Sequence, residues 1–496
     1  MKKTDLVYLF IILAYSTLFY NQWLGINLFI FNLLLAISYR VINKNLFKSW
    51  QGVLAVAGVI LTGTTSLLYG NVLSFTVSFI SISTLSLIAF SNKSSVIMSI
   101  AHFAYNLVLS MFFILESIGK RLDKIADKSF KKTKRTVGLI VIPIIVLLLF
   151  FFLYRNANPL FKEQTDFINL DFISLKWFAF TLIGSVILFG LFFPNYIEDW
   201  TNKDLKASNK ASLFSGKYFY NYIGAKSEFK LGITLLILLN VLLFFVNLTD
   251  ASYLIFGADF PSHLTRSELV HNGVGNLILS IVLAIIIVIY FFRGRNNFLK
   301  TKSLKYLTIT WLLQNSITVV FTLFKNNYYV FEHGLTYKRI GVYIYLALTL
   351  IGITITIYKV INANSFWFMV RKLGWSFYMF GIISAFIPWN TFIANTNINL
   401  HLSYNAKLDL DYFSELGVEG LMVLEKRKEE LKISHSKNYV DHIDTYKFLL
   451  DYKERDWRSQ NIQDNYNYNL IINNYEGNKM EYDLYTEEHN AHHIRY

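Results

Sequence analysis

Ionisable side chains that could bind a ligand gather in three short polar segments between apolar runs. They are Arg155, His263, Arg266, Glu268, Glu332, His333 and Arg339. If these segments share one side of a membrane, their cationic groups could form a polar mouth that binds an anion or a lipid headgroup. The other interpretation is that they are solvated loops whose long side chains anchor the ends of membrane spans. We favour the second interpretation.

The same segments carry no recognised catalytic or metal-binding pattern. His263, Glu268 and His271 lack the spacing that places two imidazoles on one face of a helix around zinc. The sequence contains no cysteine, which excludes disulfides, thiol catalysis and thiolate metal sites. No glycine-rich phosphate-binding loop follows a strand pattern. We therefore expect no enzyme activity, no cofactor and no metal.

The composition places these residues in a membrane protein. Of the 496 residues, 54% are hydrophobic and 16% are charged, whereas soluble domains carry about 25% charged residues. The net charge of +14 comes from basic residues in short loops between apolar runs, where such residues determine topology. We expect the lipid bilayer as the first partner and other membrane proteins as further partners. Nucleic acid is not expected, because no binding motif accompanies the charge.

A basic block, residues 116–136, sets the orientation of the chain. It is followed by residues 137–154, an apolar run without charge, which is long enough to cross the roughly 30 Å hydrocarbon core as a helix. Because basic blocks remain in the cytoplasm, the next helix is predicted to run outward. Counting spans from this point predicts a membrane protein with a cytoplasmic N-terminus and an extracytoplasmic C-terminus.

The predicted fold is all-α, a polytopic bundle of about eleven membrane spans within residues 1–391. The predicted spans are 6–20, 24–38, 53–69, 72–90, 137–154, 175–193, 231–248, 274–292, 306–324, 340–358 and 375–391. These spans contain essentially no ionisable residue, which argues against a proton-coupled carrier, since such carriers need a buried carboxylate or histidine relay.

Residues 96–115 are ambiguous in this topology. Ser99, His102, Asn106 and Ser110 recur at intervals of three and four residues and form a polar stripe on one helical face. If this helix spans, the basic block lies outside, against the charge rule. We therefore predict that it lies in the membrane plane or is re-entrant, with His102 facing water. The alternative is a twelfth span that packs through its small polar face.

The composition changes at about residue 392, and residues 392–496 are predicted to form a small extracytoplasmic helical module with a disordered end. One helix is expected over residues 418–431. A second, amphipathic helix is expected along an apolar stripe from Tyr439 to Trp457. We predict that Asp409, Asp411, Asp456, Trp457 and Arg458 pack this module together, with Trp457 buried in a small apolar core and Arg458 or Asp456 paired across to the 409–411 block.

Three blocks of sequence resemble a known family. They are Glu-His-Gly-Leu-Thr-Tyr-Lys-Arg at 332–339, Lys-Leu-Asp-Leu-Asp-Tyr at 407–412 and Asp-Trp-Arg-Ser-Gln-Asn-Ile at 456–462. They are similar to blocks of the bacterial integral-membrane proteins grouped as domain of unknown function 4173, with its relative 4153. The resemblance covers roughly the C-terminal two-thirds of the chain, and His333 and Gln460 depart from the family pattern. It implies a many-span bundle of the bacterial inner membrane with a small C-terminal helical module, but no mechanism.

These features favour a non-enzymatic membrane scaffold, sensor or assembly factor. The first alternative is a permease or lipid flippase that uses the polar mouth, and a buried carboxylate in a pore would favour it. The second is a membrane-embedded transferase, and paired outward acids around a cleft would favour that. The small-molecule or lipid ligand, if there is one, is not identified by the sequence.

Overall fold

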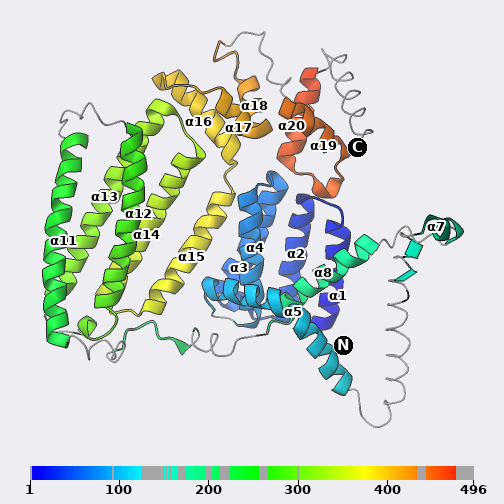
Figure 1. Cartoon of the computed structure of the whole chain (residues 1–496), viewed down its shortest axis with the longest axis horizontal. Helices are drawn as coiled ribbons and strands as arrows, with labels where there is room; N and C mark the ends of the chain where they lie inside the picture. The colour runs from blue at the N-terminus through cyan, green and yellow to red at the C-terminus, as the bar shows by residue number, and fades with distance from the viewer. Residues whose placement is uncertain are drawn as a thin grey trace. The chain divides into compact units, whose positions relative to one another are not determined.

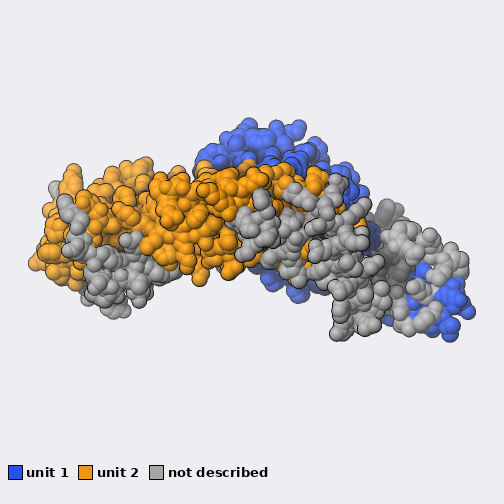
Figure 2. Space-filling view, turned by 90° about the horizontal axis from the view of Figure 1, so that it is seen from above, with its two compact units in different colours: residues 1–205, 455–462 blue, residues 206–454, 463–496 orange. Residues whose placement is uncertain are grey.

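The computed structural model describes residues 3–91, 94–124, 147, 150–151, 154–155, 158–165, 175–195, 204, 206–212, 224–255, 266–298, 301–432 and 443–475. Within these ranges every regular element is a helix, apart from one isolated β-bridge between Lys210 and Asn364. The predicted all-α fold is confirmed. The chain divides into two compact units: unit 1 comprises residues 1–205 and 455–462, and unit 2 comprises 206–454 and 463–496 (Figure 2).

Unit 1 is built from helical hairpins and a further packed pair of helices (Figure 1). Its helices are α1 (Lys3–Phe19), α2 (Ile26–Ile42), η1 (Leu46–Lys48), α3 (Trp50–Leu68), α4 (Val72–Phe90), α5 (Val96–Lys124), α7 (Pro159–Thr165), α8 (Leu175–Phe192) and η4 (Trp457–Ser459). Helices α3 and α4 begin at side-chain caps, because Ser49 accepts a hydrogen bond from the Gly52 amide and Asn71 accepts one from the Ser74 amide.

Small hydroxyl residues allow α2, α3 and α4 to approach one another closely. The Thr62 and Ser81 hydroxyls donate to carbonyls of their own helices at 2.7 and 2.8 Å, which satisfies both groups in the interior. The Asn32 amide of α2 donates to the Val59 carbonyl of α3 at 2.9 Å and to the Ser78 hydroxyl of α4 at 2.8 Å. Such small and amide side chains connect helices where the surroundings are apolar.

Unit 2 contains long helices followed by a group of shorter ones (Figure 1). They are α11 (Ala225–Leu254), α12 (Arg266–Phe291), η2 (Arg295–Phe298), α13 (Ser303–His333), α14 (Tyr337–Ile361), α15 (Phe366–Ala385), α16 (Trp389–Tyr404), α17 (Asp411–Glu415), α18 (Gly417–Lys426), α19 (Ile443–Glu454) and α20 (Ile462–Tyr475). An apolar core joins α11 to α14 through residues such as Leu236, Val288, Val319 and Leu346.

Six described helices are long and apolar enough to cross a membrane, by length and composition: α3, α4, the 96–114 part of α5, most of α11, α13 and α14. Helix α2 and the apolar parts of α8 and α12 are shorter. The expectation of several apolar membrane helices is confirmed, while the number of spans stays a prediction. Most of the predicted span 137–154 lies outside the described residues, as do residues 125–136 of the basic block.

The predicted final span over residues 375–391 does not form one continuous helix. Helix α15 ends at Ala385, and α16 begins at Trp389 with an axis bent by 68° from that of α15. Pro388 lies at the break and is the N-cap of α16. The proline ring disfavours a helical conformation at the preceding residue, Ile387, so the helix cannot continue through it. The predicted domain boundary at 391/392 falls inside α16.

The polar stripe of α5 does not face water. Ser99, His102, Asn106 and Ser110 are all buried. The Asn106 side chain exchanges hydrogen bonds with the Asn195 backbone, accepting from its amide at 2.9 Å and donating to its carbonyl at 3.2 Å. The stripe therefore packs against α8 and residue 195, as in the alternative of a helix that packs through its small polar face, because amide and hydroxyl groups satisfy neighbouring backbone groups there.

Candidate functional site

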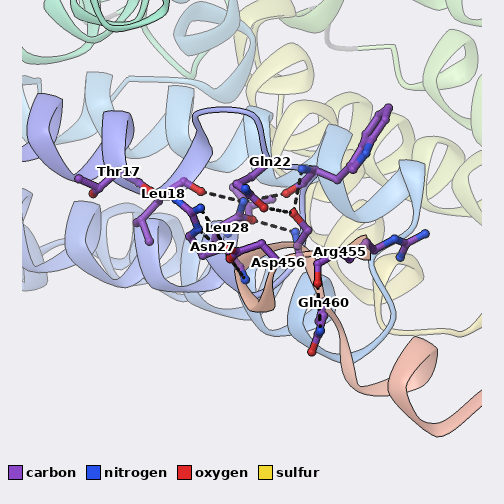
Figure 3. A network of polar contacts seen from close by, with 12 residues as sticks. Thr17, Leu18, Gln22, Asn27, Leu28, Arg455, Asp456 and Gln460 are labelled. Atoms are coloured by element: carbon purple, nitrogen blue, oxygen red, sulfur yellow. Dashed lines mark hydrogen bonds and ion pairs between the residues drawn. The ribbon is translucent and has the colours of Figure 1, made fainter. Parts of the chain in front are cut away.

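The most distinctive polar site in the described residues is the docking of residues 455–462, here called the clip, onto the turn between α1 and α2 (Figure 3). The Gln460 carbonyl accepts a hydrogen bond from the Ile26 amide at 3.0 Å. The Ser459 hydroxyl accepts from the Trp23 amide at 2.9 Å and donates to the Gln22 side-chain oxygen at 2.7 Å. These contacts join positions more than 430 residues apart in the sequence.

The clip supplies acceptors that the start of α2 needs. The first amides of a helix have no partner within that helix, and Ile26 is the first residue of α2. Its amide is satisfied by the clip, while Asn27 serves the adjacent amides of Gly25 and Leu28, each at 2.8 Å from the Asn27 side-chain oxygen. The clip therefore caps α2 from a distant part of the chain.

Gly25 makes this approach possible. A β-carbon at position 25 would lie 2.5 Å from the Gln460 carbonyl oxygen and 2.7 Å from the carbonyl carbon and oxygen of Ser459. All of these are backbone atoms, so a side chain could not be accommodated by a rotamer change. Gly70, in the α3–α4 turn, has φ of +44° and is also close to the clip, with its virtual β-carbon 3.4 Å from the Asn461 amide nitrogen.

A charged fork inside the clip fixes its shape. Two nitrogens of the Arg458 guanidinium donate to the two Asp456 oxygens at 2.8 and 3.1 Å, and the Arg458 amide donates to the same carboxylate at 2.9 Å. Hydrogen bonds from the Arg458 side chain, and then from its amide, lower the pKa of Asp456. The guanidinium also donates to the Thr17 carbonyl at the end of α1. The fork thus connects the clip to the first hairpin.

The prediction that Trp457 is buried in a small apolar core is wrong. Its side chain is 56% exposed, whereas Ser459 and Asn461 are 3% and 6% exposed. The inward positions of the clip are polar because they face backbone amides and carbonyls at helix ends, which need hydrogen-bond partners. The apolar stripe contributes to a core without Trp457, since Tyr446 and Leu449 of α19 pack with α18 and α20.

An apolar cavity of about 400 Å³ lies inside unit 1 next to the α1–α2 turn. Its walls come from α1, α2, α4, α5 and α8, and include Phe19, Phe31, Phe79 and Leu188. Gln22, which accepts the hydrogen bond from Ser459, also lines it. The clip and the cavity therefore both contact Gln22.

The other two family-like blocks meet each other in unit 2. The Lys407 amide donates to the Glu332 carbonyl at 3.1 Å, and the Tyr337 amide donates to the Tyr412 hydroxyl at 3.2 Å. Burial raises the pKa of Tyr412. Asp409 accepts a hydrogen bond from the Tyr412 amide at 3.3 Å and so starts the turn into α17. These contacts are structural ties between the end of α13, the start of α14 and the 407–412 segment.

The structure describes only some of the residues proposed to form the polar mouth. Glu332, His333 and Arg339 lie together at the α13–α14 turn, with 4.0 Å between the His333 and Glu332 side chains. The Arg339 guanidinium donates to the His333 carbonyl at 2.9 Å and lies over the Tyr329 ring, 4.1 Å from its centre. The interpretation of Arg339 as a structural anchor accounts for these contacts.

The remaining candidates for the polar mouth are Arg155, His263, Arg266 and Glu268. Arg155 is buried and belongs to unit 1. His263 lies outside the described residues, and Arg266 and Glu268 lie in the first turn of α12 with side chains outside them. Among the described residues no three histidines or carboxylates are grouped so as to hold a metal ion.

Ion pairs join the long helices of unit 2. Arg293, just after α12, pairs with Glu228 of α11 at 2.9 Å, with Glu228 almost fully buried. Lys325 of α13 pairs with Asp250 of α11 at 2.7 Å. All four residues lie just beyond the ends of the predicted spans 231–248, 274–292 and 306–324, because α11 and α13 extend further than their apolar cores. Each carboxylate has a cationic partner, which makes the burial tolerable.

The fold and the buried polar connections define an all-helical protein with several apolar helices suited to a membrane. The model of a protein family described as Domain of unknown function (DUF4153) matches residues 7–426. The chain belongs to this family. The match begins closer to the N-terminus than the resemblance implied and ends before the clip, and the related label 4173 is not shown. No curated protein and no solved structure matches the chain.

Proposed function

We propose that this protein is a multi-span scaffold or sensor of the bacterial inner membrane, without catalytic activity. The observation that carries the proposal is the clip, which binds the C-terminal part of the chain to its first helical hairpin through three hydrogen bonds and the Arg458 contact. The clip thus anchors the segment between α19 and α20 to the first hairpin, and such an anchor suits a scaffold that displays a binding surface.

The core at the start of the tail supports the same proposal. Val330 of α13 and Ile340 of α14 pack with Ile393 of α16 and with Phe413 and Leu424 of α17 and α18. A displacement of the long helices would therefore move α17 and α18 with them, because a close-packed core transmits strain. This coupling is what a sensor of the membrane state or of a membrane partner requires.

In-cell photo-crosslinking of the full chain tests the proposal. A photoreactive residue at the exposed Asn469 of α20 is expected to crosslink a discrete protein partner. A Gly25→Ala variant, which releases the clip, is expected to reach the membrane at the normal level and to lose that crosslink. Gly341→Ala is the matched control, because a β-carbon there meets no atom within 4 Å. Absence of any protein crosslink with the unaltered clip would refute the scaffold proposal.

A lipid flippase is the second candidate, and the apolar cavity of unit 1 favours it. Its volume of about 400 Å³ lies within the range of ligand pockets, roughly 300–1,000 Å³. Its apolar walls suit a hydrocarbon chain. Each methylene group buried there contributes about 0.8 kcal/mol of favourable transfer free energy. The polar Gln22 side chain marks the wall nearest the α1–α2 turn.

Lipid exchange in proteoliposomes decides between the two functions. A flippase predicts protein-dependent transfer of a fluorescent phospholipid between leaflets. An Ile187→Trp change, which fills the cavity, should abolish this transfer, whereas Ile183→Trp on the exposed face of the same helix should not. The scaffold proposal predicts no transfer above that of protein-free vesicles.

A further inference from the structure

A polar cavity of about 250 Å³ lies in the tail helices of unit 2, between α16, α18 and α20. Thr391 and Asn395 line it from α16, Glu419 and Lys426 from α18, and Tyr466 and Asn467 from α20. Its size is just below the usual range for ligand pockets, roughly 300–1,000 Å³, so it suits a single small polar molecule. None of the residues lining this cavity belongs to the clip, and the proposed function does not use it.

Asn467 provides the strongest indication of a ligand. The residue is 1% exposed, and its side-chain oxygen accepts a hydrogen bond from the Gln463 amide nitrogen at 3.2 Å. Its own amide nitrogen has no hydrogen-bond partner among the residues that the structure describes. A buried donor without a partner is destabilising, so a group that lines a cavity in this state is suited to donate to a bound molecule.

Glu419, which lines the cavity from α18, supplies an acceptor. Its carboxylate is half-buried and makes a long contact, 3.5 Å, with the Asn390 amide nitrogen. Burial raises the pKa of Glu419, and the nearby Asp464 carboxylate adds to this effect. The carboxylate therefore has spare acceptor capacity toward the cavity, and a donor from a ligand would relieve its poor solvation.

The cations of the cavity are already engaged. The Lys426 ammonium donates to the Tyr466 hydroxyl at 2.5 Å and lies 5.0 Å from the centre of its ring. The Arg427 guanidinium donates to Glu430 and Asn399. A phosphate would be repelled by the Glu419 carboxylate and would find no unpaired arginine to bind it. A simple cation would be repelled by the Lys426 ammonium.

We infer that this cavity binds a neutral polyhydroxylated molecule, of the size of one sugar ring, between Asn467 and Glu419. A sugar hydroxyl can accept from the Asn467 amide while another donates to the Glu419 carboxylate, and neither step requires a net charge. The partly exposed Tyr466 side chain and Thr391 also line the cavity, whose mixed apolar and polar character suits the alternating faces of a sugar ring.

Titration calorimetry on the full chain in lipid nanodiscs free of sugar-headed detergent tests this inference. D-glucose and N-acetyl-D-glucosamine are the probes, with glycine and inorganic phosphate as the zwitterionic and anionic comparators. At least one sugar is expected to bind at one site per chain, and both comparators are expected not to bind. Asn467→Leu and Glu419→Leu should each weaken sugar binding at least about tenfold, the loss expected for one unmade hydrogen bond to a charged or buried group.

Asn469→Leu is the matched control, because Asn469 is on the same helix but exposed and outside the cavity; it should leave the affinity unchanged. The unliganded Asn467→Leu protein should unfold at the same temperature as the wild type or higher, since it loses an unsatisfied donor, which separates a ligand role from a structural one. Failure of both sugars to bind, binding of glycine or phosphate in their place, or sugar binding that neither cavity variant weakens would overturn the inference.

Discussion

Replacing Gly25 by alanine is the most direct test of the clip. The added β-carbon would lie 2.5 Å from the Gln460 carbonyl oxygen and 2.7 Å from Ser459 backbone atoms, closer than any carbon can approach. The α1–α2 turn is held from its other side by Asn27, whose amide nitrogen donates to the Leu18 and Trp23 carbonyls. The clip is therefore expected to move, and the hairpin to remain.

The expected effect follows from the hydrogen bonds that would be lost. Displacement breaks the bond from the Ile26 amide to Gln460, at 3.0 Å, and the two bonds of the Ser459 hydroxyl, at 2.9 and 2.7 Å. A typical protein hydrogen bond contributes about 1 kcal/mol net, so docking should weaken by about 3 kcal/mol. This corresponds to an increase of about 100-fold in the population of the released clip.

Amide hydrogen exchange of the full chain in nanodiscs measures that population. Exchange of the Trp23 and Ile26 amides reports local opening, because both amides are bonded to the clip. In the alanine variant their exchange rates should rise about 100-fold, together with those of residues 455–462, while the interior of α2 should stay protected. Gly341→Ala should change none of these rates.

Two results would refute the reasoning. Unchanged exchange at Trp23 and Ile26 would mean that the backbones do not approach as closely as the structure places them. A loss of protection along the whole of α2 would mean that Gly25 is needed for the hairpin itself, and the clip would no longer be a separable element.

Three other outcomes are expected. Arg458→Gln should accelerate amide exchange in the clip, because it breaks the charge-assisted hydrogen bonds to Asp456, worth about 1.5 kcal/mol or more. Trp457→Ala, at an exposed position, should change the exchange rate by less than the equivalent of about 0.5 kcal/mol. A larger effect of Trp457→Ala than of Arg458→Gln would restore the idea of a buried tryptophan. Lys325→Met should lower thermal stability by leaving Asp250 half-buried and unpaired, by about 3 kcal/mol, and the added Asp250→Asn change should recover most of the loss; equal melting points for the single and double variants would contradict this. Glu419→Gln should raise the stability of the unliganded protein at neutral pH, because the raised pKa of Glu419 means that its charged form is penalised on folding. This gain in stability should disappear as the pH falls through that raised pKa, since the native carboxyl is then protonated and the penalty is absent. A gain independent of pH would exclude the charge as its cause.

Most of the helices could be predicted from the sequence. The predicted run 72–90 coincides with α4, and 53–69 differs from α3 by a few residues, since apolar length is the dominant signal for such helices. The ends of the longer helices were missed, because charged residues such as Glu228 and Asp250 continue the helix past its apolar part. Pro388 was visible in the sequence, but the predicted span 375–391 ran through it.

The environment of α5 shows a different limit. Periodicity identified the stripe of Ser99, His102, Asn106 and Ser110 correctly, but a polar stripe can face water or a polar surface of the protein equally well. What decides between them is the Asn195 backbone, which exchanges two hydrogen bonds with Asn106. That partner is 89 residues away in the sequence, and no local pattern indicates it.

The clip illustrates why the site was harder to predict than the fold. The block 456–462 was identified as structural, but its tryptophan was given the main role because buried aromatic area usually dominates packing energy. The block binds instead to a helix start, where the unmet requirement is for hydrogen-bond acceptors to free amides. A serine hydroxyl, a backbone carbonyl and a glycine that leaves room for them meet that requirement, and an indole ring does not. At the ends of membrane helices, therefore, short polar residues next to a distant glycine are better candidates for long-range docking than the aromatic residue beside them.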